Sequence, residues 1–367
     1  MYPSSSSGSA RSQVLAGLVA LAGSASGQLS TRPAVFPGLD ILGPGISSNL
    51  PLTTASSVMW ATGYIPMYCK YEAGAQGVSP YDIQVFNITY SDCSTPWVFC
   101  RHKDSPTSQT DMINQFGRLP VKMRNYVRHV ISIPTGGGAH AWSGVGDIMI
   151  RGAVTTAQAL TVWIHEIAHC IDNHNGPGGT SDFSATSTWL TAFNADTAVP
   201  DGYATTSQAE NFAQNTVVAL YDRLNTLTGG IWGQPYDVWK IQNQFTAVET
   251  KLGSQLLPGG TCSRGIYSGV TVSSPVVCAG PLSTACLAAG YPLKKRGNGR
   301  AAVEEIEKRA VGVLESRKLT LADVPANRTT AADKAKSYRG PLPKGVDANA
   351  PYPLNCANPV LPDFWTY

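Results

Sequence analysis

Five consecutive residues, His165-Glu166-Ile167-Ala168-His169, have the types and spacing of a zinc-binding helix. A helix turns by about 100° per residue, so two histidines four positions apart project from the same side and can hold one metal ion. Glu166 lies beside them and can take a proton from a zinc-bound water, whose pKa the metal lowers toward neutrality. The segment therefore predicts a zinc ion bound by His165 and His169, with Glu166 as the general base of a hydrolytic reaction.

The helix that carries these residues is expected to span residues 155–174 and to end at Gly176-Pro177. Its apolar side chains recur at helical spacing and form one stripe, made of Leu160, Ile164, Ile167 and Ile171. The two histidines point to the opposite side of the helix. A helix that buries its stripe and turns two histidines toward a cleft suits a zinc site, whereas the alternative is a surface helix with polar histidines on its outer face.

Zinc in a hydrolase usually takes three protein ligands and a water, and Glu210 is the strongest candidate for the third ligand. The segment Ser207-Gln208-Ala209-Glu210 also has the pattern of a capping box, in which Glu210 would bond back to the start of a helix expected over 206–225. However, Glu210 lies within about 20° of the apolar Val217 in helical projection, so it should point inward. A carboxylate aimed at the interior is costly unless it is paired or binds a metal.

Asp182 is the alternative third ligand. It lies in Gly179-Thr180-Ser181-Asp182, which partly resembles the Gly-Thr-x-Asp segment of the deuterolysin-type aspzincins, although the Tyr-Gly that should follow is absent. Asp172 and His174 lie too near the end of the first helix to converge easily on the same ion. The remaining histidines precede that helix and are expected to be ordinary polar or loop residues: His102, His129 and His140.

The stretch from Gly202-Tyr203-Ala204 to Glu210-Asn211-Phe212-Ala213-Gln214 resembles the zinc-binding region of the lethal-factor-like gluzincins, which include the secreted Pro-Pro endopeptidases. In that family a Tyr stands seven residues before the ligand Glu, which is the separation of Tyr203 and Glu210. The resemblance implies that Tyr203 donates a hydrogen bond to the oxyanion of the tetrahedral intermediate, that Glu166 is the general base, and that the zinc ligands are His165, His169 and Glu210.

This resemblance covers roughly residues 127–225 and departs from the family at Gln214, where the family often has an acid. It implies an α+β, zincin-like metallopeptidase domain in which a second helix carries the third ligand. The whole chain, from Tyr81-Asp82-Ile83-Gln84-Val85 through the metal helix, also resembles fungal secreted proteins labelled conidiation-specific. That label states when a protein is made and implies no chemistry.

The elements around these helices are expected to be four strands and a third helix. Apolar and polar alternation, or short apolar runs, predict the strands at 82–90, 97–101, 127–133 and 147–151. The last of these is the predicted edge strand on which an extended peptide would lie. Apolar residues on one face predict the third helix over 235–252.

The N-terminus predicts a secretion signal over residues 1–27. Arg11 supplies the positive region, residues 14–25 are apolar, and Ala25 and Gly27 are small residues at suitable cleavage positions. The apolar run is too short to span a bilayer. We therefore expect a secreted, extracellular protein.

The cysteines and glycosylation sequons agree with export. An even number of cysteines suggests up to four disulfides of unreadable connectivity, with Cys93 and Cys100 close enough in sequence to pair; the eight are Cys69, Cys93, Cys100, Cys170, Cys262, Cys278, Cys286 and Cys356. Cys170, next to His169, is expected to be a disulfide or a buried thiol. Sequons at Asn87 and Asn327 suggest a glycoprotein.

Charge is sparse and nearly balanced, with a net charge of +3, so neither nucleic acid nor membrane is an expected partner. Residues 294–345 are the exception, with 13 Lys and Arg against 6 Asp and Glu. Two basic pairs there, Lys295-Arg296 and Lys308-Arg309, are candidate processing sites. The expected organisation is an extended, Pro-, Gly- and Ser-rich lead-in over 28–57, a zincin-like catalytic domain over 58–256 and a Cys-containing, basic C-terminal extension over 257–367.

The residues together predict a secreted zinc metalloendopeptidase with one zinc ion per chain and a peptide or protein as substrate. The alternative is a secreted, wall-associated or interaction protein that binds zinc on a zincin fold without turnover. Glu166 and Tyr203 favour the enzyme, because a purely structural zinc site needs neither residue.

Overall fold

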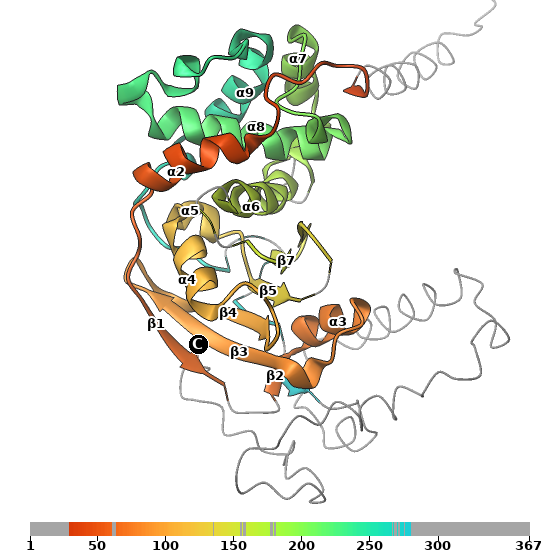
Figure 1. The fold of residues 1–367 in the computed structure, drawn as a ribbon, viewed down its shortest axis with the longest axis vertical. Helices are drawn as coiled ribbons and strands as arrows, with labels where there is room; N and C mark the ends of the chain where they lie inside the picture. The colour runs from red at the N-terminus through yellow and green to blue at the C-terminus, as the bar shows by residue number, and fades with distance from the viewer. Residues whose placement is uncertain are drawn as a thin grey trace, which may run out of the picture. The chain divides into compact units, whose positions relative to one another are not determined.

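A computed structural model describes residues 29–279, apart from short gaps at 61–63, 135, 155, 157–158, 177–178, 180, 266, 268–269, 271 and 275 (Figure 1). The chain divides into two compact units, Met1–Val276 and Val277–Tyr367, and the described residues belong almost wholly to the first. The predicted secretion signal, the basic segment, the Asn327 sequon, Cys286 and Cys356 lie outside the described residues.

A six-stranded mixed sheet forms one layer of the first unit. Its order is β1 (Ala55–Met59), β3 (Ile83–Tyr90), β4 (Cys93–His102), β5 (His129–Ile133), β7 (Asp147–Arg151) and β6 (Ala139–Trp142). Strands β4, β5 and β7 run parallel, while the pairs β1–β3, β3–β4 and β6–β7 are antiparallel. Two short strands, β2 (Tyr64–Pro66) and β8 (Val276–Cys278), complete the set in the described ranges.

The four predicted strands are present, but the prediction that residues 147–151 form the edge of the sheet is wrong. Strand β7 lies between β5 and β6, and its continuous apolar run Ile148-Met149-Ile150 is fully buried. Such a run is typical of an interior strand covered on both faces. The edge is instead β6, a four-residue strand that follows the glycines at 136–138.

The three predicted helices correspond to α6 (Leu160–Asn175), α8 (Gln208–Leu224) and α9 (Gln242–Leu252), the last preceded by a 3-10 turn at Val238–Ile241. The sequence did not predict α3 (Met67–Ala75), α4 (Gln109–Arg118), α5 (Val121–Arg124) and α7 (Ser187–Ala195). The lead-in is not simply extended, because it contains η1 (Leu39–Leu42) and α2 (Gly43–Asn49). Leu39, Leu42 and Ile46 recur at helical spacing there and are buried.

Helix α6 is the central element of the fold, with the sheet on one side and α7, α8 and α9 on the other (Figure 1). The four residues of its predicted apolar stripe are all fully buried. On the sheet side, Phe116 of α4 makes edge-to-face contacts with Trp97, Phe99 and the α6 residue Trp163. Such aromatic contacts add to the free energy gained from burial and fix the position of α6 on the sheet.

Disulfides join Cys69 to Cys100 and Cys93 to Cys262, so the predicted Cys93–Cys100 pair is wrong. Both of these cysteines lie on β4, and seven residues of extended strand separate them by roughly 23 Å, far beyond the reach of one disulfide. Cys170 is a buried thiol, as predicted. Asn87, the asparagine of the first sequon, lies inside β3 with 7% of its surface exposed, and its Oδ1 accepts a hydrogen bond from Trp60 Nε1.

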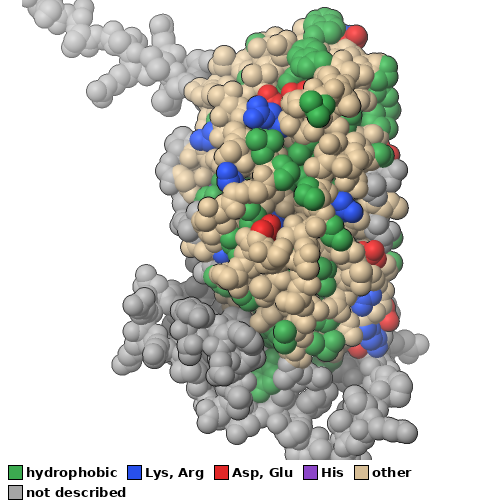
Figure 2. Space-filling view, turned by 90° about the vertical axis from the view of Figure 1, so that its left-hand side faces the viewer, with side chains coloured by type: hydrophobic (Ala, Val, Ile, Leu, Met, Phe, Trp, Pro, Cys, Tyr) green, Lys and Arg blue, Asp and Glu red, His purple; other side chains and the backbone are tan. Residues whose placement is uncertain are grey.

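On the face shown in Figure 2, Lys and Arg side chains are interspersed with Asp and Glu, and no large patch of one sign is visible. Among the helices in the described ranges, none is both long enough and apolar enough to cross a membrane.

Candidate metal centre

Helices α6 and α8 bring His165, His169 and Glu210 together. Glu210 Oε2 lies 2.9 Å from His165 Nε2 and 3.1 Å from His169 Nε2, and the two Nε2 atoms are 3.1 Å apart. Ligands in a tetrahedron at zinc distances of about 2.0–2.1 Å lie about 3.4 Å from one another. Within the described ranges, this is the one group of three His, Cys, Asp or Glu side chains arranged closely enough to hold a metal ion.

Ser207 caps the start of α8, so the Glu210 carboxylate is not needed as a cap and can contact the two histidines. Ser207 Oγ accepts a hydrogen bond from the Glu210 N–H at 3.1 Å, which satisfies an N-terminal donor of the helix. Only this half of the expected capping box forms, since the Glu210 carboxylate turns toward His165 and His169. The apolar stripe of α8 packs beneath, with Ala213 and Val217 fully buried.

A chain of hydrogen bonds behind His165 fixes its tautomer. Gln214 Nε2 donates to Asp201 Oδ2 at 2.7 Å, and Gln214 Oε1 lies 3.0 Å from His165 Nδ1. An ionised carboxylate only accepts hydrogen bonds, so the amide nitrogen of Gln214 must face Asp201 and its oxygen must face the histidine. His165 therefore carries its proton on Nδ1 and presents the lone pair of Nε2 to Glu210 and His169.

The residues fit a divalent cation. With Nε2 of His165 unprotonated, its 2.9 Å contact with Glu210 Oε2 joins two acceptors, which leaves His169 Nε2, 3.1 Å from the same oxygen, as the ring nitrogen that could donate to it. Acceptor lone pairs converging on one point repel one another unless a cation lies between them. Neutral imidazole nitrogen and carboxylate oxygen are also the ligand atoms that commonly bind zinc in catalytic sites.

Glu166 lies beside this cluster and is only 5% exposed. Burial raises its pKa to about 7, and the nearby Glu210 adds to the rise, while His169 and Arg151 oppose it. A carboxyl group with a pKa near neutrality exchanges protons readily at neutral pH, as a general base requires.

Tyr203 begins a short 3-10 helix, η6 (Tyr203–Thr205), immediately before α8. Its ring centroid lies 5.5 Å from that of His165, and the side chain remains 54% exposed. Partial burial, with Glu210 and Glu166 contributing, raises the pKa of Tyr203 above its usual value. The phenol is therefore protonated at neutral pH and can donate a hydrogen bond.

A cleft of about 210 Å³ opens over these residues. The α6 residues that face it are His165, Glu166, His169 and Asp172, while Tyr203, Ala209 and Glu210 form another wall. The edge strand β6 contributes Ala139, His140 and Ala141.

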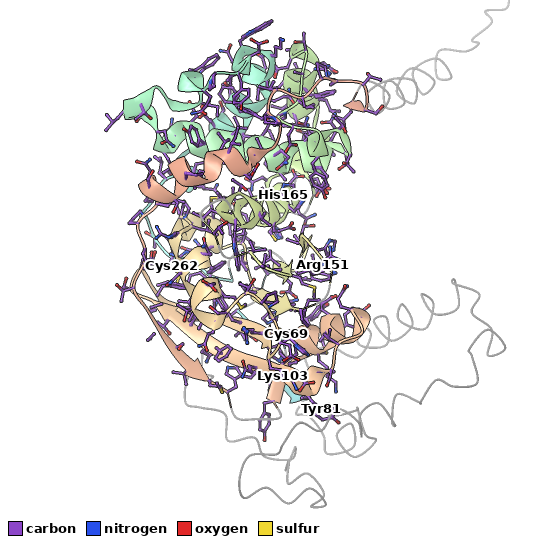
Figure 3. All side chains as sticks on the ribbon, viewed as in Figure 1. Cys69, Tyr81, Lys103, Arg151, His165 and Cys262 are labelled. Atoms are coloured by element: carbon purple, nitrogen blue, oxygen red, sulfur yellow. A yellow bond between two sulfur atoms is a disulfide. The ribbon has the colours of Figure 1, made fainter. Side chains whose placement is uncertain are left out.

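His140 was expected to be an ordinary histidine, but it lies at the cleft. Burial lowers its pKa there, and Arg151 and His169 contribute to the decrease. His165 of α6 and Arg151 of β7 are labelled in Figure 3.

The other sequence candidates lie apart from the metal cluster. Asp182 lines the same cleft, but its Oδ1 accepts a hydrogen bond from Asn173 Nδ2 at 2.9 Å, and it is not a member of the three-residue group. Asp172 accepts hydrogen bonds from the N–H and hydroxyl of Ser184. The three remaining histidines interact with other groups: His174 with Gly179 O, His102 with Asp104, and His129 with Asp147.

Asp201 and the role of Gln214 were not predicted from the sequence. Asp201 is buried, and its Oδ1 also accepts the N–H groups of Tyr203 and Ala204 at 3.1 Å each. The position of an Asp two residues before Tyr203 suggests a turn, but no spacing rule connects it to a glutamine thirteen residues later on another element.

A family model for conidiation-specific protein Con-13 matches residues 34–323, most of the chain, including the whole candidate metal centre. The chain belongs to the Con-13 family. Over 252 residues this family member is 30% identical to conidiation-specific protein 13 of Neurospora crassa, an alignment that covers 67% of the chain and 70% of the relative. No solved structure matches it. The predicted resemblance to fungal conidiation-specific proteins is thereby confirmed, while the chemistry must be argued from the site itself.

Proposed function

We propose that this Con-13 family member is a secreted zinc metalloendopeptidase with a zincin-like fold and a gluzincin ligand set. The observation that carries the proposal is the convergence of three possible metal-ligand atoms, from His165, His169 and Glu210, beside a buried Glu166 in an open cleft. A closed structural zinc site would surround the ion with protein ligands and would leave no room for a substrate.

His165, His169 and Glu210 would hold the zinc ion. When bound, zinc acidifies a water molecule and polarises the carbonyl of the peptide. Glu166, whose pKa is raised to about 7, takes a proton from the attacking water and delivers it to the leaving amine. The hydroxyl of Tyr203 donates a hydrogen bond to the carbonyl oxygen as that oxygen becomes negative.

The edge strand β6 supports a peptide as the substrate. Arg151 N–H donates to Gly138 O, and N–H and C=O groups alternate in direction along an antiparallel ladder. Ala141 lies three residues after Gly138, so its backbone N–H and C=O groups point away from β7. Ala141 also lines the cleft. An extended peptide can pair with such an edge, which would place one of its carbonyl groups over the metal cluster.

The test combines metal analysis with a peptide digest of the secreted protein. We expect about one zinc per chain and cleavage of a random peptide library, with Glu166→Gln lowering kcat at least about 100-fold while retaining the zinc. Glu72→Gln is the matched control, since Glu72 is also a buried glutamate with a raised pKa but lies away from the cleft, and it should leave kcat unchanged.

Two outcomes would contradict the proposal in different ways. Less than about a tenth of a zinc per chain, after purification without chelators, would remove the metal centre altogether. Full zinc occupancy without cleavage of any peptide would favour the secreted, non-catalytic zinc-binding protein instead.

A further inference from the structure

Asp201 is a buried carboxylate that contacts neither of the histidines nor Glu210, yet it connects two parts of the metal centre. Its Oδ2 accepts the hydrogen bond from Gln214 Nε2 that orients the amide toward His165. Its Oδ1 accepts the backbone N–H groups of Tyr203 and Ala204. One side chain thus contacts the residue behind a candidate zinc ligand and the turn that carries Tyr203.

We propose that Asp201 is the positioning residue of this centre, fixing the Nδ1–H tautomer of His165 through Gln214 and the place of Tyr203 through the backbone of η6. The proposal rests on the zinc binding proposed above, but not on turnover. It assigns no contact with substrate to Asp201, which acts through other groups.

The first arm depends on the direction of each proton. Asp201, Gln214 and His165 are all buried, so water cannot readily replace a lost partner. The carboxylate has no proton to give and therefore determines which end of the Gln214 amide faces it. An amide alone could face His165 with either end, and only one of the two orientations leaves Nε2 free to bind a metal.

The second arm fixes the distance between His165 and Tyr203. Asp201 precedes η6 and satisfies two N–H groups at the start of this turn, as a capping residue does. The same carboxylate also binds Gln214, which contacts His165. The positions of the Tyr203 backbone and of the His165 ring therefore both depend on Asp201. An acid at position 214 would contact His165 directly, but it would not by itself connect that histidine to the turn.

Asp201→Asn tests the first arm while keeping the shape of the side chain. The oxygen of the new amide can still accept from Tyr203 and Ala204, but its nitrogen would face the amide nitrogen of Gln214. Gln214 must then turn over, which directs a donor at His165 Nδ1 and moves the histidine proton to Nε2. We expect zinc affinity, measured by competition with a chromophoric chelator, to fall about 10–100-fold.

The double variant Asp201→Asn, Gln214→Glu should restore the affinity. The carboxylate introduced at position 214 would accept from the amide introduced at position 201 on one side and from His165 Nδ1–H on the other, so the histidine regains its metal-binding tautomer. We expect zinc binding within about threefold of the wild type. A purely structural role for Asp201 would not produce this rescue by a second change at the site.

Asp201→Ala tests the second arm. Removal of Oδ1 should speed hydrogen exchange at the amides of Tyr203 and Ala204, whereas Asp201→Asn should leave their protection unchanged. Asp196→Asn is the control for the loss of a buried carboxylate, since Asp196 accepts hydrogen bonds from Asn243 and Gln244 away from the cleft. It should lower the Tm without changing zinc affinity.

Wild-type zinc affinity in Asp201→Asn, or no recovery in the double variant, would overturn the positioning role. Equal exchange rates at Tyr203 and Ala204 in Asp201→Ala and the wild type would overturn the second arm. Absence of zinc binding by the wild type would instead overturn the proposed function, so the two failures are distinguishable.

Discussion

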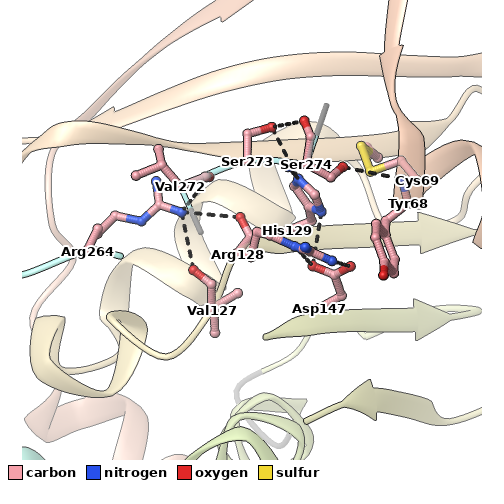
Figure 4. A network of polar contacts seen from close by, with 11 residues as sticks. Tyr68, Cys69, Val127, Arg128, His129, Asp147, Arg264, Val272, Ser273 and Ser274 are labelled. Atoms are coloured by element: carbon pink, nitrogen blue, oxygen red, sulfur yellow. Dashed lines mark hydrogen bonds and ion pairs between the residues drawn. A yellow bond between two sulfur atoms is a disulfide. The ribbon is translucent and has the colours of Figure 1, made fainter. Parts of the chain in front are cut away.

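In the described part of the chain, a histidine ring nitrogen lies about 3 Å from a carboxylate oxygen in two clusters, one inside the sheet and one at the cleft. In the sheet, His129 Nδ1 lies 3.0 Å from Asp147 Oδ1, and Arg128 donates to both oxygens of Asp147 at 2.9 and 2.6 Å (Figure 4). The N–H of Ser274 donates to His129 Nε2, so the proton of a neutral His129 lies on Nδ1 and faces the carboxylate. Both oxygens of Asp147 and Nε2 of His129 therefore accept a hydrogen bond.

The metal centre has the opposite arrangement. The proton of His165 points outward to Gln214, so His165 Nε2 and Glu210 Oε2 are two acceptors that face one another at 2.9 Å. Residue types alone therefore do not distinguish a metal site from a buried ion pair. The direction of the protons and access to a cleft distinguish them.

Neutralising one carboxylate in each cluster gives the largest expected contrast. Asp147→Asn leaves Arg128 buried without its partner and should lower the free energy of unfolding by about 3–5 kcal/mol. Glu210→Gln relieves acceptor repulsion, so the metal-free protein should lose less than about 1 kcal/mol while zinc binding is abolished. Urea unfolding of both variants without metal measures the difference. Equal destabilisation by the two substitutions would contradict the contrast.

Zinc itself should stabilise only proteins with an intact cleft cluster. Free zinc at about 1,000 times its Kd adds about 4 kcal/mol to the free energy of unfolding of a protein that binds it only when folded. The wild type and Asp147→Asn should both gain this increment, and Glu210→Gln should gain none. Thermal unfolding with and without a chelator measures it, and a zinc-dependent rise in the Tm of Glu210→Gln would mean that other residues bind the metal.

The disulfides allow the surroundings of the sheet cluster to be weakened without touching the cleft. Cys262 ties β4 to the segment whose Arg264 donates to the carbonyl groups of Val127 and Arg128 and whose Ser274 contacts His129. Replacing Cys93 and Cys262 with Ala should cost about 2–4 kcal/mol of stability and leave zinc affinity unchanged. Urea unfolding and chelator competition measure the two quantities, and a loss of zinc affinity would show that the two clusters are coupled.

Removing Cys69 and Cys100 is the matched comparison. That pair is 31 residues apart in sequence against 169 for Cys93 and Cys262, so its loss should cost about 1.5 kcal/mol less on loop-closure entropy. A larger loss of stability for the shorter loop would show that native contacts, and not the length of the loop, determine the effect.

The residue positions in the candidate site that the sequence predicted depend on local spacing. His165, Glu166 and His169 occupy one helix, and the apolar stripe of that helix predicts which side they face. Glu210 lies on another helix. It was selected as the third ligand because it shares a helix face with the inward-facing Val217 and follows Tyr203 by seven residues, as in the family that this segment resembles. The structure brings it to the histidines, whereas Asp182 stays bonded to Asn173.

One failure involves contacts between distant segments, and the others concern short local elements. Sequence proximity suggested a Cys93–Cys100 pair, but a strand holds the two residues apart and their partners come from 31 and 169 residues away. Strand β6 was not predicted because four residues next to a glycine-rich loop are too short a run to show a periodicity, and this placed the sheet edge one strand too early. Helix α4 was missed although Ser108 and Asp111 form a capping box at its start.

Glu72 borders the sheet cluster and provides the smallest predicted effect. It is 3% exposed, and burial, together with the nearby Asp147, raises its pKa to about 8, although Arg128 opposes the rise. An unfolded glutamate has a pKa of about 4.3, so between about pH 4.3 and 8 the folded protein retains a proton that the unfolded chain has lost. The contribution of Glu72 to stability is therefore fully present at low pH and is lost as the pH rises toward 8.

Glu72→Gln keeps the uncharged form at every pH and should remove this contribution to the pH dependence. At pH 8 we expect the variant to be more stable than the wild type by at least about 1 kcal/mol, because one pKa unit corresponds to about 1.36 kcal/mol. Near pH 4 the two proteins should have equal stability. Urea unfolding at pH 4, 6 and 8 measures the difference, and a gap that is constant across these pH values would show that Glu72 is ionised throughout and that Arg128 compensates it. That outcome would make the sheet cluster a three-charge network of Glu72, Asp147 and Arg128 instead of a closed ion pair with a protonated glutamic acid beside it.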